Sequence, residues 1–591
     1  MRQVVDKFVA ASLFRSVYSL NLQLFIVNTE IMKKTLSIPI FILKAMLLIC
    51  LSISDLQGQQ PVWSFAKSFG GNYADLTFSH LSIDGENNII INGDFFSLNL
   101  QIGTSSFSSN GADDVFLAKF DSLGNVLWAK TMGGTDYDAA SAISIDLNNN
   151  IYITGVFYSD SINFDNITLY NRGISNIFIA KFDPHGNVVW AKATENIVRT
   201  SGNDIEIDLN GNILITGECL DSVFVFAGDS TFVPHDPHYM QVFLIKLDSS
   251  GNLIWTKFIE GSLNEDNSKI TCDASGNCFI LFLSRSPSIK IGTDSVQDYS
   301  NGGVYLLKLD PSGHLIWGKN AGGSGSCYNY DIVMDSNDNI YFSGSSTCDT
   351  LFFDSLYLLN NTSTENAFLA KYDSSGQVEW VKYFGGNNMD IATSIAINRD
   401  DGPTITGFFA STSISIDGTI LQNDSIYSSD IFLTSFDSLG NKIYAIRYGG
   451  TGSEEGYGVY ISNDGTMYLN GHFSSDPLIL NNVMVSNSTH SYDVFFAKSD
   501  LILSSKSMAT NDEINLVNVS PNPNSGHFQI DSSDPIEKII VSDLPGRIVY
   551  EKNYSGTITK NISINLSENG MFFIQAQMKG ETCTSRVIVS R

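Results

Sequence analysis

Basic residues are scarce in this chain. Its 591 residues include 34 lysines and arginines against 62 aspartates and glutamates, which gives a formal net charge of −28. Such a field repels phosphate backbones and anionic lipid headgroups. We therefore expect no nucleic-acid partner, and we attribute the acidity to solubility outside the cell.

Residues that build catalytic and metal sites are also few. The chain has 8 histidines and 7 cysteines, and it contains no Gly-x-Ser-x-Gly elbow, His-Glu-x-x-His helix or phosphate-binding glycine loop. We therefore predict no catalytic residues and no cofactor. Helix-forming residues are also scarce, whereas the 48 glycines and the many Asn, Asp and Ser residues suit short strands joined by tight turns. The composition predicts an all-β protein.

One long hydrophobic run, residues 36–53, follows Lys33 and Lys34 and precedes a polar stretch. This order of a positive, an apolar and a polar region is typical of a secretory signal peptide. The run is marginal for spanning about 30 Å of hydrocarbon, so we prefer a cleaved leader to an uncleaved anchor. We assign residues 32–58 to the signal peptide, and we expect residues 1–31 to reflect a start codon placed too early.

A repeated phrase runs through most of the chain. Each copy has an alternating strand, a turn and a second strand that carries an aromatic residue, as in residues 114–130. We predict that the aromatic column packs neighbouring repeats together and does not stack on sugars, because buried aromatics dominate core energetics. Its members, spaced by 62 to 65 residues, are Trp63, Trp128, Trp190, Trp255, Trp317, Trp380 and Tyr444.

The two ends of the repeat array are complementary. Residues 493–500 form a half-copy without a following strand, and residues 62–67 form a strand without a preceding one. Seven four-stranded units whose last strand comes from the N-terminus describe a closed ring, because closure removes the open sheet edge. A linear solenoid would need capping repeats at both ends. We therefore predict a seven-bladed β-propeller over residues 62–500, closed by the strand at residues 62–67.

The repeated phrase also supports a family resemblance. Asp-x-Phe-Leu-Ala-Lys-Phe-Asp-x-x-Gly-Asn-x-x-Trp-Ala-Lys, followed by Gly-Gly, resembles the bacterial seven-bladed β-propeller repeats. The resemblance covers residues 62–500. It implies the fold and leaves the activity open, since propellers host unrelated functions.

The last part of the chain breaks the period. A Ser-rich linker at residues 501–513 leads into residues 514–591, whose short strands and proline-containing turns predict a small β-sandwich. This segment resembles the type A sorting domain of the type IX secretion system of Bacteroidetes-type bacteria. The motif residues that carry the resemblance are Pro521, Asn522, Pro523, Gly526, Gly546, Gly570 and Arg586.

The sorting-domain resemblance implies partners and a location. Members of that family pass through an outer-membrane translocon, and a sortase-like protease removes the domain. The family usually has Lys where this chain has Arg586 and Tyr where it has Phe572, and both departures are conservative. We therefore expect residues 514–591 to engage the translocon and the sortase. The mature protein is then secreted or anchored at the outer cell surface.

Acidic residues open the first strand of several repeats. First strands line a propeller's central channel, so we expect these carboxylates near one mouth of it. There they could hold calcium or a basic ligand, and their mutual repulsion would raise some pKa values. A solvated rim of turn-forming residues is the alternative that we favour. The candidates are Asp75, Asp138, Asp266, Asp390 and Glu455.

Two pairs of cysteines flank hairpin turns whose centres lie one repeat apart. We expect the members of each pair to lie opposite each other across the same kind of hairpin. In an oxidising compartment Cys327 and Cys348 are disulfide candidates. Cys272 and Cys278 are weaker candidates, because cross-strand pairs often have poor disulfide geometry.

A rigid wheel of loops without a catalytic set favours recognition over chemistry. We predict a secreted or surface-displayed propeller that acts as a binding or adhesion module for an extracellular glycan or protein. Two alternatives stay open. One is an extracellular polysaccharide-degrading enzyme, a lyase or glycosidase, whose carboxylates would come from loops on one face. The other is a structural surface component.

Overall fold

The computed structural model divides the chain into two compact units, residues 1–503 and 504–591. It describes residues 60–71, 80–220, 223–226, 229–232, 238–297, 302–362, 364–425, 427–487, 491–499, 517–520, 527–532, 536–543, 547–554, 561–566, 570–578 and 581–589. The predicted signal peptide, the preceding residues and the linker lie outside these ranges. Every element among the described residues is a β-strand. No helix among them is long and apolar enough to cross a membrane.

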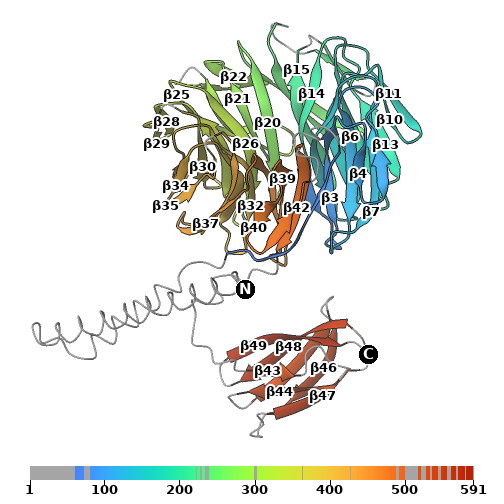
Figure 1. Ribbon diagram of the computed structural model, residues 1–591, viewed down its shortest axis with the longest axis vertical. Helices are drawn as coiled ribbons and strands as arrows, with labels where there is room; N and C mark the ends of the chain where they lie inside the picture. The colour runs from blue at the N-terminus through green and yellow to red at the C-terminus, as the bar shows by residue number, and fades with distance from the viewer. Residues whose placement is uncertain are drawn as a thin grey trace, which may run out of the picture. The chain divides into compact units, whose positions relative to one another are not determined.

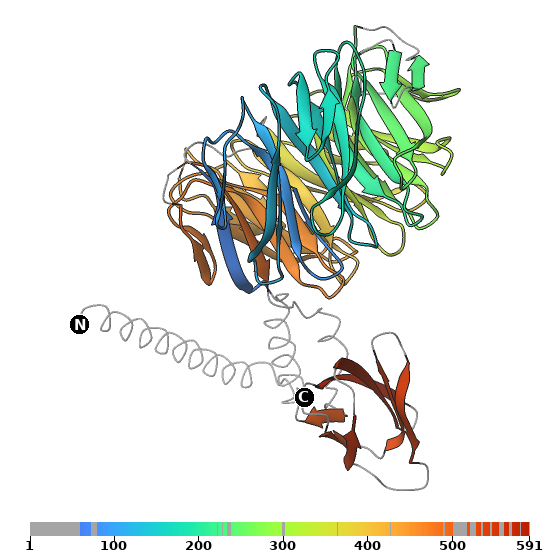
Figure 2. The ribbon, with the colours of Figure 1, turned by 90° about the vertical axis from the view of Figure 1, so that its right-hand side faces the viewer.

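The first unit is a ring of seven four-stranded antiparallel blades (Figures 1 and 2). The innermost strand of each blade contacts the innermost strand of the next, and β38 contacts β2, so the ring is closed. The predicted seven-bladed propeller is therefore confirmed. The innermost strands are β2 (His80–Ile83), β8 (Asp138–Ile145), β14 (Thr200–Ile207), β20 (Glu265–Cys272), β26 (Cys327–Met334), β32 (Asp390–Ile397) and β38 (Glu454–Ile461).

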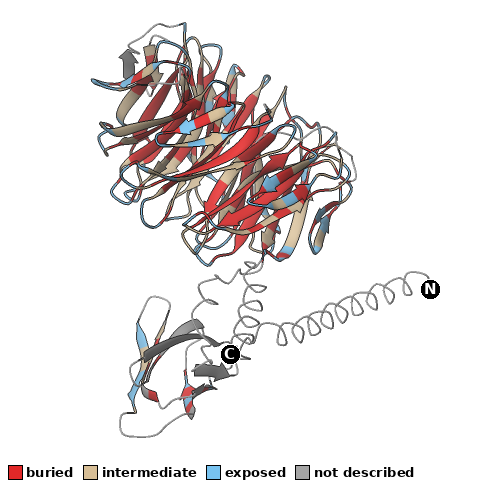
Figure 3. Ribbon diagram, turned by 90° about the vertical axis from the view of Figure 1, so that its left-hand side faces the viewer, coloured by how far each residue is buried: buried red, intermediate tan, exposed pale blue. Residues whose placement is uncertain are grey.

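The two middle strands of each blade are its most buried part, and Figure 3 shows the exposed residues mainly in loops and turns. The second strands are β3 (Ile89–Phe95), β9 (Ile151–Phe157), β15 (Ile213–Cys219), β21 (Cys278–Ser284), β27 (Ile340–Ser346), β33 (Pro403–Phe409) and β39 (Met467–Phe473). The third strands are β6 (Asp114–Phe120), β12 (Asn176–Phe182), β18 (Gln241–Leu247), β24 (Gly303–Leu309), β30 (Asn366–Tyr372), β36 (Asp430–Phe436) and β42 (Asp493–Ser499).

The fourth, outermost strands come from the same repeats except in the last blade. They are β7 (Val126–Met132), β13 (Val188–Ala193), β19 (Leu253–Glu260), β25 (Leu315–Gly323), β31 (Val378–Phe384), β37 (Lys442–Tyr448) and, in blade 7, β1 (Trp63–Phe69). β1 pairs antiparallel with β42, which joins the first described strand to the last repeat. The predicted closing strand is thus confirmed.

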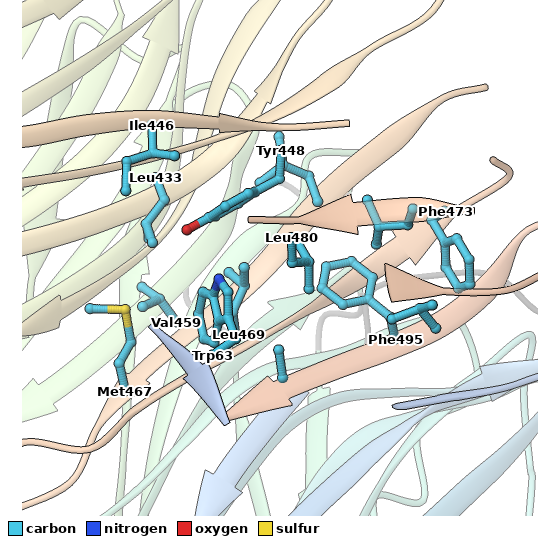
Figure 4. Packing of buried hydrophobic residues seen from close by; sticks show 14 of the residues in the cluster. Trp63, Leu433, Ile446, Tyr448, Val459, Met467, Leu469, Phe473, Leu480 and Phe495 are labelled. Carbon is cyan, nitrogen blue, oxygen red and sulfur yellow. The ribbon is translucent and has the colours of Figure 1, made fainter. Parts of the chain in front are cut away.

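The pairing of β1 with β42 shows that one predicted member of the aromatic column is wrong. In blade 1, Trp128 lies opposite Lys119, and in blade 7 the residue opposite the equivalent Lys498 is Phe65. Phe65 therefore occupies the tryptophan position, and placing Trp63 there was wrong by two residues. Trp63 begins β1, where no turn joins it to β42, and it is only 1% exposed. Figure 4 shows it in the hydrophobic core that blades 6 and 7 share.

The remaining tryptophans lie against the next blade. The ring of Trp128 lies so close to Gly186 that a Cβ on that glycine would come within 2.9 Å of it. Gly186 also has a φ of 81°, which favours glycine. The indole Nε1 of Trp128 donates to the carbonyl oxygen of Pro184 at 3.3 Å. The tryptophan thus connects its own outer strand to a turn of the following blade.

A lysine on the third strand makes a second link between blades. Lys119 forms an ion pair with Asp84 at 2.8 Å inside its own blade and donates to Pro184 O of the next blade at 3.0 Å. Blade 6 has Ser435 in place of the lysine, and Asn398 replaces the aspartate and donates to the Ser435 hydroxyl at 3.0 Å. Both members of the ion pair are therefore replaced by neutral residues in blade 6.

An additional hairpin lies between the second and third strands of each repeat. In most blades it pairs with the outer strand of the preceding blade, as β22 does with β19 and β28 with β25. The hairpins are β4 (Leu100–Ile102) with β5 (Ser105–Phe107), β10 (Ser161–Phe164) with β11 (Ile167–Tyr170), β16 (Val223–Phe226) with β17 (Asp229–Phe232), β22 (Ser288–Ile291) with β23 (Asp294–Gln297), β28 (Thr350–Phe353) with β29 (Leu356–Leu359), β34 (Ser413–Ile416) with β35 (Thr419–Gln422), and β40 (Leu478–Leu480) with β41 (Val483–Val485).

The second unit consists of two antiparallel sheets, which confirms the predicted small sandwich. One contains β43 (Val517–Ser520), β44 (His527–Ser532) and β47 (Asn561–Asn565). The other contains β46 (Ile548–Asn553), β45 (Ile536–Asp543), β48 (Gly570–Met578) and β49 (Glu581–Val589). Gly570 begins β48, and Arg586 lies in β49 opposite Phe573. The other predicted motif residues, Pro521, Asn522, Pro523, Gly526 and Gly546, lie outside the described residues.

Candidate binding site in the central channel

The innermost strands of all seven blades enclose a cavity of about 740 Å³ in the central channel. Small-molecule sites in proteins typically have volumes of about 300 to 1,000 Å³. Its lining combines aromatic, amide, hydroxyl and charged side chains, which come from every blade. The fold therefore places a cavity with a mixed polar and apolar lining at the point where the seven repeats meet.

Two adjacent positions on the innermost strands differ in how much their residue type varies among the seven blades. When the blades are compared by hydrogen-bond register, one position is aliphatic in all seven: Leu81, Ile143, Ile205, Ile270, Ile332, Ile395 and Val459. The position before it holds six residue types, and we call these the floor positions: His80, Ala142, Asp204, Lys269, Asp331, Ser394 and Gly458. All seven floor residues line the cavity.

Repeats keep the residues that packing requires, as the aliphatic position shows. The floor positions share the same backbone geometry, yet their side chains range from glycine to lysine. Packing alone therefore does not set them.

Three consecutive blades place charged residues on the floor. Asp204 accepts a hydrogen bond from the backbone N–H of Ile270 in the next blade at 2.9 Å. Asp331 accepts from the N–H of Ile395 at 2.8 Å, again across a blade boundary. Burial is the larger effect on both carboxyls and raises their pKa values. Lys269 lies between the two aspartates in sequence, and its positive charge lowers both pKa values in part. Burial thus raises the pKa of Asp331 to about 6.

Tyrosines and amides line the rest of the cavity. Tyr137 packs edge-on against Tyr158 with ring centroids 5.8 Å apart, and Tyr330 and Tyr457 line the cavity from other blades. Arg199 also lines it, and the guanidinium Nε is buried without a hydrogen-bond partner among the described residues. These groups offer donors, acceptors and aromatic faces to a ligand.

The predicted strand-opening acids do not all share one register position. Asp138 and Asp390 are buried at the first positions of β8 and β32, where each accepts a hydrogen bond from a serine hydroxyl at 2.8 Å, Ser159 and Ser411 respectively. In blades 4 and 7 the equivalent residues are Glu265 and Glu454, not the predicted Asp266 and Glu455. Asp75 lies outside the described residues. The four predicted acids that the structure describes therefore occupy two neighbouring positions at the start of the innermost strands.

A sequence signal for the correct acids does exist. In each of the four pairs the serine follows its acid by 21 residues, which links Asp138 to Ser159, Glu265 to Ser286, Asp390 to Ser411 and Glu454 to Ser475. Each contact ties the start of an innermost strand to the loop that leaves the second strand. Their role is to hold the loops of one blade together.

Burial dominates the ionisation of these loop-tying acids. It raises the pKa of Glu265, Asp390 and Glu454 to about 7 in each case, against hydrogen bonds that favour the carboxylate. Among the residues that the structure describes, no three His, Cys, Asp or Glu side chains form a group that could hold a metal ion.

Both predicted cysteine pairs are close in space, but they differ in register. Cys272 lies directly opposite Cys278, with sulfurs 3.6 Å apart. Cys327 lies opposite Ser346, so its expected position opposite Cys348 was wrong by two residues, yet the two sulfurs are only 3.3 Å apart. A hydrogen bond from the Cys327 thiol, opposed by burial, lowers the pKa of Cys348 to about 6, which favours the reactive thiolate.

We propose that Cys327 and Cys348 form a disulfide after export, when an external oxidant accepts two electrons and the two thiol protons are released. We expect unreduced, denatured protein to resist iodoacetamide at both positions, and reduction to destabilise it by about 3 kcal/mol, the typical value for a loop of this size. Peptide mass spectrometry before and after reduction measures the pairing, and a double serine variant, whose stability should not respond to reductant, is the control. Alkylation of both cysteines without reduction would contradict the pairing.

Comparison with known proteins identifies the second unit. Residues 518–590 match the family described as "Secretion system C-terminal sorting domain". The chain therefore carries a type IX secretion sorting domain and is exported to the cell surface or secreted, as predicted.

Two further proteins are similar to part of this chain. The chain is 24% identical over 420 residues to an uncharacterized WD repeat-containing protein of Acanthamoeba polyphaga mimivirus, covering 58% of this chain and 30% of the viral protein. It is 27% identical over 153 residues to the regulatory protein FlaEY of Caulobacter vibrioides, covering 25% of this chain and 16% of that protein. The matches thus span less than a third of either relative.

Solved structures give weak overlaps. A Dyadobacter fermentans protein of unknown function superposes with a TM-score of 0.35 and 7% identity, covering 74% of this chain and 98% of that one. PorZ, a surface component of the type IX secretion system of Porphyromonas gingivalis, gives a TM-score of 0.19 and 8% identity, covering 90% of this chain and 100% of that one.

Proposed function

We propose that this protein is an exported binding or adhesion module that recognises an extracellular ligand through the central cavity of its propeller. The sorting domain brings the propeller out of the cell, and the ring of blades holds the cavity in a fixed geometry. A rigid scaffold that presents varied side chains at one point is suited to recognition.

One observation carries this proposal: the contrast between the aliphatic and the floor positions of the innermost strands. Seven copies of one strand keep a branched aliphatic residue at one position and hold six residue types at its neighbour, which lines the cavity. Asp204 and Asp331 also link neighbouring blades through backbone hydrogen bonds, but this role does not require the lysine that lies between them at the cavity. A ligand with its own pattern of polar groups accounts for the difference.

The sorting domain has partners of its own in this proposal. We propose that residues 514–591 engage the outer-membrane translocon and are then removed by the sortase. The propeller is left free in the medium or fixed to the outer surface. The binding function belongs to the first unit alone.

Bead adhesion tests the proposed function. Beads that carry the purified two-unit protein are washed over surfaces coated with polysaccharides or with extracellular proteins, and the released solution is assayed for new reducing ends and for unsaturated sugars. Retention without released products is the expected result. Release of products would favour the degrading-enzyme alternative, and absence of retention on every surface would contradict a binding or adhesion role.

A further inference from the structure

We infer that the central cavity takes the end of a carbohydrate chain. This inference rests on the proposed function and specifies the chemical class of the ligand.

The charges on the cavity floor favour a neutral ligand. Lys269 lies on β20 between the blades that carry Asp204 and Asp331, and both carboxylates already accept backbone hydrogen bonds from the following blade. With Asp94 and Arg199, which also line the cavity, the lining carries three acids and two bases, a formal net charge of −1, so a multiply charged ion would find little charge to neutralise it. A ligand with hydroxyl groups can donate to the carboxylates and accept from the ammonium group without adding a buried charge.

The walls provide further groups that suit hydroxyls. Arg199 lines the cavity with a buried Nε that has no hydrogen-bond partner among the described residues. The guanidinium also carries two NH2 groups, which can donate to an acceptor on a ligand. Asn203 and Asn267 line the neighbouring wall, and each already donates through its amide nitrogen, to Glu218 Oε1 and Asn329 O respectively. The polar groups are thus held in place before a ligand arrives.

The adjoining wall, on blade 2, is largely apolar. Blade 2 presents Ala139, Ala140 and Ala142 to the cavity, with Val156 beside them. The Tyr137–Tyr158 pair continues this wall. A sugar ring has hydroxyls at its edge and apolar C–H groups on its faces, so it matches one wall with donors and acceptors and another with alanine and aromatic surface. An anion or a strongly basic peptide would leave this apolar wall without a partner.

Filling the cavity tests the inference. Ser201 lines the cavity and is partly exposed, so Ser201→Trp should occupy part of its volume without entering the core. Ser295→Trp places the same side chain on the exposed hairpin strand β23 and serves as the matched control. Arg199→Ala removes the unpartnered donor. The probes are maltohexaose, cellohexaose, chitohexaose and a galacturonate oligomer, with binding followed by calorimetry.

We expect at least one neutral oligosaccharide to bind, with affinity lost in Ser201→Trp, kept in Ser295→Trp, and reduced about tenfold or more in Arg199→Ala. Melting curves of the variants show whether each is folded. Equal affinity in Ser201→Trp and Ser295→Trp would overturn the cavity site while leaving a binding role intact. Binding of the acidic oligomer alone, or adhesion of beads to proteins only, would overturn the neutral carbohydrate as ligand.

Discussion

Replacing Trp63 with alanine is expected to lower the free energy of unfolding of the propeller by about 3 to 5 kcal/mol, the usual cost of removing a large buried aromatic side chain. Trp63 is 1% exposed and packs edge-on against Tyr448, with ring centroids 5.9 Å apart. Its backbone also accepts a hydrogen bond from Asn482 at 2.9 Å. The residue therefore fixes the closing strand β1 to blades 6 and 7. Denaturant titration of the purified protein measures the loss.

Trp128→Ala is the matched control for the closing strand. Trp128 is only half-buried and lies on an outer strand whose hairpin stays covalently closed, so we expect about half the loss seen at Trp63, or less. This contrast follows from the register of β1 and would not follow if Trp63 belonged to the aromatic column. Equal losses in the two variants would show that the closing strand has no special role in stability.

The stability of the propeller should be highest in mildly acidic solution and should fall as the pH rises toward 8. The pKa values of Glu265, Asp390 and Glu454 are raised to about 7 by burial, whereas unfolded carboxyls titrate near 4. A raised pKa means that the folded state binds the proton more tightly. Its contribution is complete below pH 4 and is lost as the pH passes through 7. Each group alone would change the free energy of unfolding by about 4 kcal/mol.

The turn aspartates act in the opposite direction at lower pH. Burial alone would raise the pKa of Asp84 and Asp208, but hydrogen bonds from Asn88 and Asn212 and the nearby lysines outweigh it and hold the pKa values below their usual range. Their contribution is present above the unfolded pKa near 4 and is lost as the pH falls below it. The buried acids and the turn aspartates together place the stability maximum near the unfolded carboxyl pKa, at about pH 4.

Melting temperatures across pH 3 to 9 measure this profile. A variant that combines Glu265→Gln, Asp390→Asn and Glu454→Gln should flatten the decline between pH 5 and pH 8. Asp294→Asn, on an exposed hairpin strand, is the control and should leave the profile unchanged. A melting temperature that rises from pH 5 to pH 8, or a triple variant that keeps the full decline, would contradict this account of the buried acids.

The repeats determine the architecture, because the same hairpin phrase recurs and its two half-copies must pair. The details that sequence reasoning missed have identifiable causes. Trp63 was assigned to the aromatic column by spacing, although the Ala66-Lys67 pair aligns with Ala129-Lys130 and puts Phe65 in that place. The loop-tying acids were assigned one residue out of register in blades 4 and 7, although the serine 21 residues later identifies the correct one.

The cavity itself could not be found from sequence patterns. Its floor residues are separated by 62 or more positions, and only the register of the innermost strands shows that they share one location. Asp204, Lys269 and Asp331 form no motif along the chain. Because the floor positions differ in residue type, a search for repeated residues passes over them. Convergence of unlike residues at one point becomes visible only when the ring closes.

Hydrogen exchange with a bound oligosaccharide tests the central claim, that the propeller binds its ligand in the channel, most directly. Peptides that cover the innermost strands β14, β20 and β26 should exchange more slowly when the probe is bound, and peptides from the outer hairpins, such as β22 with β23, should not change. Protection confined to the outer hairpins or to the second unit would contradict binding in the central cavity.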